Sequence, residues 1–176
     1  PKVAAYHRKM LNLNINLNLI NKPEEALEKR ANIINCCNEE IKVEVGFSTP
    51  QAGDAAFKAL EKDSKELKEG KIDVLVTAPI NKNNIQSNNF SFPGHTEYLE
   101  SLFGEKGDAL MILANESLRI AVATGHVPVS KISSCLTQEN ILKKIKQFNK
   151  SLIEDFGIFK PRIVVLGLSP HAGDKG

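Results

Sequence analysis

The sequence predicts an α/β protein, and three features support this fold class. The chain has 176 residues, of which 41% are hydrophobic and 25% charged, an ordinary globular composition. From Ile72 onward short apolar runs alternate with amphipathic stretches, which is typical of a largely parallel sheet covered by helices. Several predicted strands also lead into loops that contain glycine, proline and histidine, where α/β proteins place their chemistry. A chain of this length can bury a core as one domain or as two small lobes.

Four short apolar runs are the predicted strands, at residues 72–79, 108–114, 118–124 and 161–168. A further segment, 12–22, alternates asparagine with leucine or isoleucine, which favours an edge strand with one apolar face. Asparagine is a poor strand former, so the alternation alone supports that strand.

Three amphipathic stretches with clear start and stop signals predict helices. The first covers residues 49–70, where Thr49 and Pro50 take the cap and first-turn positions. The other two cover 95–104 and 137–157, and each of the three stretches ends at a glycine. The buried face of the first helix is expected to carry small and aliphatic side chains, namely Ala52, Ala55, Ala56, Ala59 and Leu60.

Charge and cysteine content exclude several classes of protein. Lys and Arg number 23 against 21 Asp and Glu, and the basic residues are scattered, so no nucleic-acid partner is predicted. Cys36, Cys37 and Cys135 form neither a disulfide framework nor a CxxC zinc motif, which favours a reducing, cytoplasmic setting. We expect no signal peptide at Pro1, and no apolar run approaches the roughly 20 residues needed to cross a bilayer. We therefore expect a soluble protein without a membrane partner.

Three of the four histidines lie in turns at the ends of predicted elements. His126 follows the third of the four main strands, His171 follows the fourth, and His95 opens the second helix. Neutral imidazole commonly binds zinc-like metals, and two histidines at strand ends of one sheet can face the same crevice. A catalytic metal usually needs a third protein ligand, so this pair is incomplete. A solvent-exposed or locally hydrogen-bonded histidine is the alternative at each position.

Two stretches suggest anion binding. In FPGHTEYLE, residues 92–100, Gly94 permits close backbone approach, His95 and Thr96 offer donors, and the helix directs its positive end at a ligand. The alternative is that Thr96 only caps the helix. Lys82 follows the first of the four strands, where it can meet a phosphate or remain an exposed lysine. The chain has no GxGxxG, Walker-type or GxSxG motif. The motifs of the sequence therefore identify no cofactor-binding residue and no catalytic residue.

Four separated stretches carry a family resemblance: VLVTAPINK (74–82), FPGHTEYL (92–99), LRIAVATGHVPV (118–129) and PRIVVLGLSPHAGDKG (161–176). In order and spacing they resemble the 4-hydroxythreonine-4-phosphate dehydrogenases of pyridoxal phosphate biosynthesis. GFSTPQAGDAAFKAL (46–60) is similar to that family's preceding helix, and residues 1–40 match weakly. The family's glycine-rich opening segment, GDPxGIGPE, and everything after the PHAG loop are absent, so the chain is expected to be an internal portion of the enzyme.

The resemblance implies the fold of isocitrate and isopropylmalate dehydrogenases, with two α/β lobes and a cleft, incomplete in this chain. Residues 1–87 would belong to the first lobe, and residues 88–176 to the second, which carries the metal and substrate loops. A cytoplasmic homodimer with its active site at the interface is expected.

By the same resemblance, the enzyme oxidises 4-phosphooxy-L-threonine with NAD or NADP, and the β-keto acid formed decarboxylates to 3-amino-2-oxopropyl phosphate. Three histidines would hold a divalent zinc, cobalt or magnesium ion, and His126 and His171 match two of them. His95 and Thr96 match the substrate-contacting pair. The alternatives are a dehydrogenase for D-threonate or D-erythronate 4-phosphate, a metal-dependent phosphatase, or an inactive binding or dimerisation fragment. The chain alone is expected to be inactive.

Overall fold

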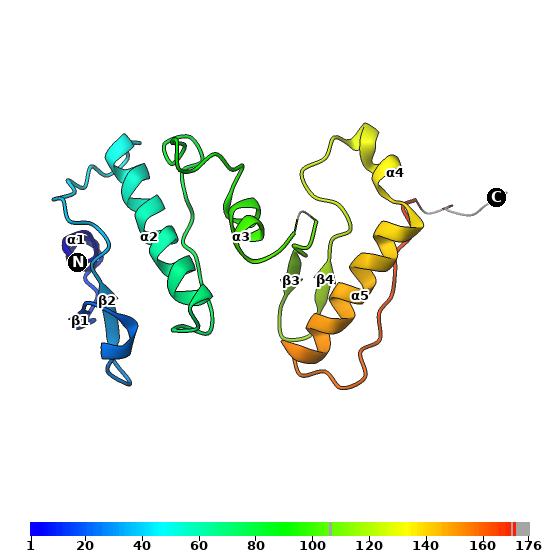
Figure 1. The fold of residues 1–176 in the computed structure, drawn as a ribbon, viewed down its shortest axis with the longest axis horizontal. Helices are drawn as coiled ribbons and strands as arrows, with labels where there is room; N and C mark the ends of the chain where they lie inside the picture. Colours follow the sequence, from blue (N-terminus) through cyan, green and yellow to red (C-terminus); the bar gives the residue numbers. More distant parts are fainter. Residues whose placement is uncertain (106, 170, 172–176) are drawn as a thin grey trace. The chain divides into compact units, whose positions relative to one another are not determined.

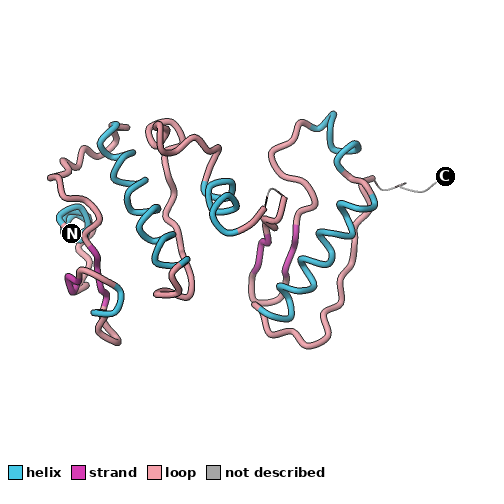
Figure 2. The backbone as a smooth tube through the Cα atoms, in the orientation of Figure 1, coloured by secondary structure: helices cyan, strands magenta, loops and turns pink. Residues whose placement is uncertain are grey.

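The computed structural model describes residues 1–105, 107–169 and 171, and the chain divides into two compact units (Figure 1). Unit 1 is Pro1–Asp108 and unit 2 is Ala109–Gly176. Each unit combines helices with a pair of short strands, which confirms the α/β class (Figure 2). The lobe boundary expected after residue 87 belongs to the implied family fold and stays a prediction.

Unit 1 begins with a helix and a small parallel sheet. In chain order it contains α1 (Lys2–Met10), β1 (Leu17–Ile20), the 3-10 turn η1 (Pro23–Glu25), β2 (Ala31–Ile34), α2 (Pro50–Lys68) and α3 (His95–Phe103). Leu17 of β1 lies opposite Ala31 of β2. The Nδ2 of Asn18 donates to Oδ1 of Asn32 at 2.9 Å, and Ile20 is buried. The asparagine-rich segment therefore contains a strand, as predicted, and the paired amides explain how asparagine is tolerated in it.

The ends of α2 follow the predicted signals. Thr49 is the N-cap, its Oγ1 accepts from the backbone N of Ala52 at 3.2 Å, and Pro50 opens the helix. Gly70 follows the C-cap with φ +69°, a left-handed conformation that glycine adopts without a steric cost.

An aromatic cluster on α2 forms the core of unit 1. Its buried members are Phe57, Leu60, Ile85, Phe90 and Tyr98. The ring of Phe90 is fully buried, with its centroid 5.8 Å from that of Phe57 and 5.4 Å from that of Tyr98. Leu60 was correctly predicted on this face, whereas Ala52 is exposed. Phe57, which was not predicted on the buried face, lies in the core, because a larger side chain gains more free energy from burial.

Two of the predicted strands are not strands in the described structure. Residues 72–79 and 161–168 carry no ladder hydrogen bonds and are drawn as loop (Figure 2). Several of their apolar side chains are open to solvent, with Val76 88% and Leu166 86% exposed, whereas Leu75 is half-buried against the core of unit 1. A strand requires a neighbouring strand to pair with its backbone, and the part of the chain that the structure describes provides none here.

Unit 2 pairs its strands in the opposite sense to the prediction. It contains β3 (Ile112–Ala114), β4 (Arg119–Ala121), η2 (Val129–Lys131), α4 (Ile132–Cys135) and α5 (Gln138–Glu154). β3 and β4 are antiparallel, so the expected largely parallel arrangement is wrong for this pair. The connection between β3 and β4, residues 115–118, is too short for a parallel crossover. Asn115 stabilises this turn, because its Oδ1 accepts hydrogen bonds from the backbone N of Ser117 at 2.9 Å and of Leu118 at 2.8 Å.

The predicted third helix is confirmed as α5. Thr137 caps it, with Oγ1 accepting from the backbone N of Asn140 at 3.2 Å, and Leu152 is buried. Gly157 follows the helix with φ +66°. Among the described residues, none of the helices combines the length and apolar character that crossing a membrane requires.

Candidate functional site

The predicted substrate-contacting pair lies in the first turn of α3. His95 is half-buried and Thr96 is exposed. The N-cap is Gly94, in extended backbone at φ −177°, and no side chain makes a capping hydrogen bond. Thr96 therefore does not serve as the cap, and both side chains remain available to a ligand.

Side-chain amides hold the turn that leads toward this helix. Asn81 Oδ1 accepts from the backbone N of Asn83 at 3.0 Å and of Asn84 at 3.2 Å. Its Nδ2 donates to Ser48 Oγ at 3.2 Å, which ties the turn to the residues just before α2. The run of asparagines after the predicted strand therefore builds a fixed turn.

Gln86 then joins the two arms of the following loop. Its Nε2 donates to the backbone oxygen of Lys82 at 3.1 Å and to that of Phe92 at 2.9 Å. Ser87 and Phe90 exchange backbone hydrogen bonds at 3.0 and 3.2 Å, and Phe90 enters the core. The loop from Lys82 to Phe92 is thus closed by one amide and fixed by one buried ring.

The same turn packs directly on α2 at Gly53. Asn84 Nδ2 donates to the backbone oxygen of Thr49 at 3.1 Å. A Cβ at Gly53 would overlap the carbonyl group of Asn84 and lie 3.0 Å from the backbone N of Ile85. Only glycine permits this approach, so helix and turn are held in one arrangement.

The side chain of Lys82 ends beside the start of α3. Its Cε and Nζ lie 3.7 and 3.8 Å from the position that a Cβ at Gly94 would occupy. Glu97 Oε2 lies 3.6 Å from the same position, and no ion pair joins it to Lys82 within the described ranges. A cation from one predicted motif therefore stands next to His95 and Thr96 of another.

The two predicted metal ligands both belong to unit 2. His126 is exposed in the loop after β4 and has φ +54°, a conformation that is uncommon for a residue with a side chain. His171 is exposed, and both of its chain neighbours lie outside the described residues, as does most of the loop 169–176. Within the described part of the chain, no group of three or more His, Cys, Asp or Glu side chains could hold a metal ion. A shared metal site stays a prediction.

Two titratable groups on the core of unit 1 have shifted pKa values. Hydrogen bonding to Lys62, with Nζ 2.6 Å from Oε1 of Glu66, is the main cause that lowers the pKa of Glu66 below its usual 4.5. Lys71, 3.2 Å from Oε2, adds to this effect. Burial raises the pKa of Tyr98, and the charge of Glu61 contributes. Glu66 is buried, so its two ion pairs offset the cost of burying the carboxylate, and the shift at Tyr98 follows from the burial of its phenol group in the same core.

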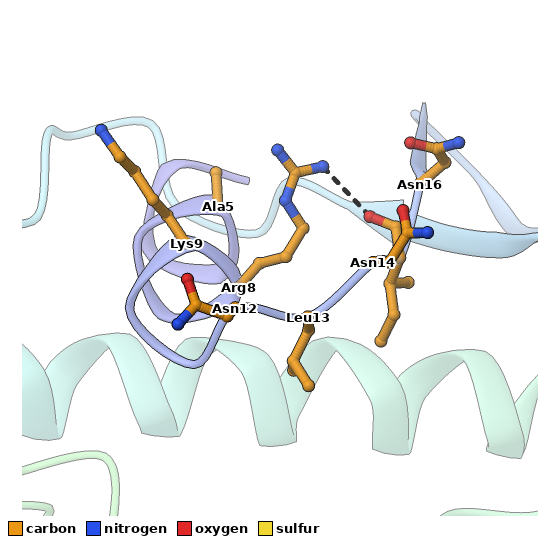
Figure 3. Close-up of a pocket in the computed structure, with 8 residues that line it drawn as sticks. Ala5, Arg8, Lys9, Asn12, Leu13, Asn14 and Asn16 are labelled. Carbon is orange, nitrogen blue, oxygen red and sulfur yellow. Dashed lines mark hydrogen bonds between the residues drawn. The ribbon is translucent and has the colours of Figure 1, made fainter.

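A shallow cavity of about 490 Å³ lies beside α1 (Figure 3). Its lining is mostly polar and comprises Ala5, Arg8, Lys9, Asn12, Leu13, Asn14, Ile15 and Asn16. Arg8 Nη1 donates to the backbone oxygen of Ile15 at 3.1 Å, which holds that side chain across the opening. None of the predicted site residues lines this cavity.

Comparison with known proteins identifies the family. The family model described as "Pyridoxal phosphate biosynthetic protein PdxA" matches residues 2–176. A 4-hydroxythreonine-4-phosphate dehydrogenase of Bacteroides thetaiotaomicron is 51% identical over 176 residues, covering 100% of this chain and 48% of that protein. One from a Sulfurihydrogenibium species is 36% identical over 175 residues, covering 99% of this chain and 53% of that protein.

Solved structures agree with this assignment. A crystal structure of 4-hydroxythreonine-4-phosphate dehydrogenase from Klebsiella pneumoniae superposes with a TM-score of 0.77 at 32% identity, covering 96% of this chain and 53% of that chain. The chain thus spans about half the length of the relatives it matches. The resemblance drawn from the four sequence motifs is confirmed, and the chain belongs to the pyridoxal phosphate biosynthetic protein PdxA family.

Proposed function

We propose that these residues form part of a cytoplasmic dehydrogenase that oxidises 4-phosphooxy-L-threonine with NAD or NADP. The observation that carries this proposal is the family match over residues 2–176, together with relatives that are named for this activity. Hydride leaves the carbinol carbon for the nicotinamide and the hydroxyl loses its proton. The resulting β-keto acid releases carbon dioxide to give 3-amino-2-oxopropyl phosphate, a precursor of pyridoxal 5'-phosphate.

The finer fold belongs to the same proposal. The complete enzyme would have two α/β lobes and a cleft, as in isocitrate and isopropylmalate dehydrogenases, and would act as a homodimer. Residues 72–79 and 161–168 support this, because they are apolar segments that have no strand partner in the described residues and expose several apolar side chains. In the complete lobes, further strands would pair with these segments and cover their exposed side chains.

In this proposal His95 and Thr96 bind the substrate. Both stand in the first turn of α3, where the backbone N–H groups have no side-chain cap. The imidazole and the hydroxyl can therefore hydrogen-bond one anionic group together with these N–H donors. The pair would fix the orientation of the substrate relative to the nicotinamide.

His126 and His171 would hold the divalent metal. Their imidazoles suit zinc or cobalt better than magnesium, which prefers oxygen ligands. The positive φ of His126 supports a functional role, since strained backbone concentrates at binding sites. A third ligand would come from outside the described residues. When bound, such an ion lowers the pKa of a coordinated hydroxyl group.

The test is turnover by a full-length enzyme that contains these 176 residues, followed through formation of reduced nicotinamide. We expect oxidation of 4-phosphooxy-L-threonine that needs a divalent metal, with activity lost in His126→Ala and kept in the control His7→Ala. Turnover of D-threonate or D-erythronate 4-phosphate in place of this substrate would refute the proposal. Release of inorganic phosphate without nicotinamide would establish a phosphatase instead.

A further inference from the structure

Cys36 and Cys37 are free thiols on neighbouring residues, and the proposed dehydrogenase chemistry uses neither of them. They follow β2, which ends at Ile34, in a segment without helix or strand that leads to α2. Both side chains are half-buried, so each is partly open to solvent. The two thiols therefore form a pair that a small dissolved reagent can reach.

The two thiol groups lie within hydrogen-bonding reach of each other. Burial is the largest cause that raises the pKa of Cys37, and the charge of Cys36 and a hydrogen bond between the two side chains add to it. Lys58 of α2 lowers the same pKa, and Asp54, whose Oδ2 lies 2.7 Å from Lys58 Nζ, raises it. When Cys36 carries the charge, Cys37 therefore keeps its proton. This is the usual division between an attacking thiol and a resolving thiol.

A thiol pair of this kind suits thiol–disulfide exchange better than metal binding. A zinc site takes at least three protein ligands. Within the ranges that the structure describes, no group of three or more His, Cys, Asp or Glu side chains could hold a metal ion. Cys135, the remaining cysteine, belongs to unit 2 and has no cysteine beside it in the sequence. The chemistry open to Cys36 and Cys37 together is thus the formation of a bond between them.

A disulfide between neighbouring residues is easily reduced again. The Cα atoms on either side of a trans peptide bond are about 3.8 Å apart, whereas ordinary disulfides join Cα atoms separated by about 4.4 Å or more. Such a bond stores strain, and strained disulfides are the labile, regulatory ones. Residues 35–39 lie outside the helices and strands, so ring closure does not break a ladder of β1 and β2.

We propose that Cys36 and Cys37 are a redox-sensitive thiol pair, which a small disulfide of the glutathione class closes into a disulfide between neighbouring residues and which small thiols reopen. Disulfides of proteins in a reducing compartment are mostly transient and redox-sensing, which agrees with a strained bond at this position. The inference is independent of the proposed dehydrogenase activity.

Two successive exchanges account for all atoms and electrons. Cys36 loses its proton, and the thiolate attacks one sulfur of the small disulfide, which forms a mixed disulfide on Cys36 and releases one small thiolate. Cys37 then loses its proton and attacks the Cys36 sulfur, which forms the bond between the two cysteines and releases the second small thiolate. The protein gives up two electrons and two protons, and the small disulfide takes up both as it becomes two thiols.

The test is peptide mass spectrometry on the full-length protein that contains these residues, after incubation with oxidised glutathione and blocking of free thiols with N-ethylmaleimide. Trypsin cleaves after Arg30 and Lys42, so the peptide 31–42 contains Cys36 and Cys37 and no other cysteine. We expect this peptide to lose two hydrogens and to carry neither label nor glutathione. An excess of reduced glutathione should restore both labels. Cys135 is the matched control, and it should carry either glutathione or the label.

Cys37→Ser separates the attacking from the resolving thiol, because the variant should stop at a mixed disulfide with glutathione on Cys36. Ring closure itself is read in the wild type, so it does not depend on how well this variant folds. Three results in the wild type would overturn the proposal: both labels retained while Cys135 is modified, glutathione left on either cysteine of the pair, or a link from peptide 31–42 to another cysteine. An enzyme that fails to oxidise 4-phosphooxy-L-threonine would leave this inference standing.

Discussion

Replacing Gly53 with alanine should destabilise unit 1, although the same change at an open helical position stabilises a helix. Glycine to alanine is worth about 1 kcal/mol in favour of the helix. At Gly53, however, the new Cβ would overlap the carbonyl of Asn84, which is backbone and cannot rotate away. Forcing an atom into a packed region costs about 1–3 kcal/mol, and this contact belongs at the upper end of that range. If the turn moves away from α2 to relieve this overlap, the hydrogen bond from Asn84 Nδ2 to the backbone oxygen of Thr49 also breaks, which costs about 1 kcal/mol. We therefore expect a net loss of roughly 2–3 kcal/mol.

Urea unfolding followed by tyrosine fluorescence measures this loss in the right unit. The chain has no tryptophan, and its two tyrosines, Tyr6 and Tyr98, both belong to unit 1. The matched control is Ala52→Gly, at the exposed neighbouring position, which reports the intrinsic difference between the two residues in this turn. A Gly53→Ala chain as stable as the wild type would refute the close approach between α2 and the turn.

Three further predictions concern a carboxylate, a helix cap and the proposed metal. The pKa of Glu66 is held below 4.5 by Lys62, so its contribution to stability is present above that pH and is lost as the pH falls below it. Glu66→Gln should lower the urea midpoint at pH 7 and flatten the acid decline of unit 1; an unchanged decline would assign it to other groups. Thr137→Ala should cost about 1 kcal/mol in unit 2, seen by circular dichroism with tyrosine fluorescence unaltered, and an unchanged transition would show that the cap is not needed. Chelation should abolish turnover by the full-length enzyme and zinc should restore it, with restoration much weaker in His171→Ala; full activity after complete metal removal would contradict the metal role of His126 and His171.

Local signals explain why the helices could be predicted from the sequence. Thr49 and Thr137 cap α2 and α5 through their own side chains, and Gly70 and Gly157 follow these helices with positive φ. Caps and stops act within a few residues, so no tertiary information is needed to recognise them. The buried face of α2 was harder to predict from the sequence. Phe57 is buried because the loop of residues 80–92 packs against it, and that contact is not local in the sequence.

Strands and side-chain neighbours were harder to predict, because both depend on segments that are distant in the sequence. An apolar run such as 161–168 has strand character, yet it becomes a strand only when another segment pairs with it. The position of Lys82 depends on Gln86, which folds the loop back with a single amide, and one glutamine gives no sequence signal. The first-turn placement of His95 and Thr96 could be predicted because it depends on the helix start alone.

The exposure of residues 161–168 has a practical consequence for anyone who prepares this chain by itself. Ile163 to Leu168 contains no charged residue and no proline, and Val164, Val165 and Leu166 are largely open to solvent. Such a segment can add to the same segment of another molecule through intermolecular β-pairing. The isolated chain should therefore aggregate increasingly with concentration, and its unfolding is best measured in dilute solution. A lysine at Val164 or Leu166 should suppress the light scattering of concentrated samples, since a repeated charge repels identical strands.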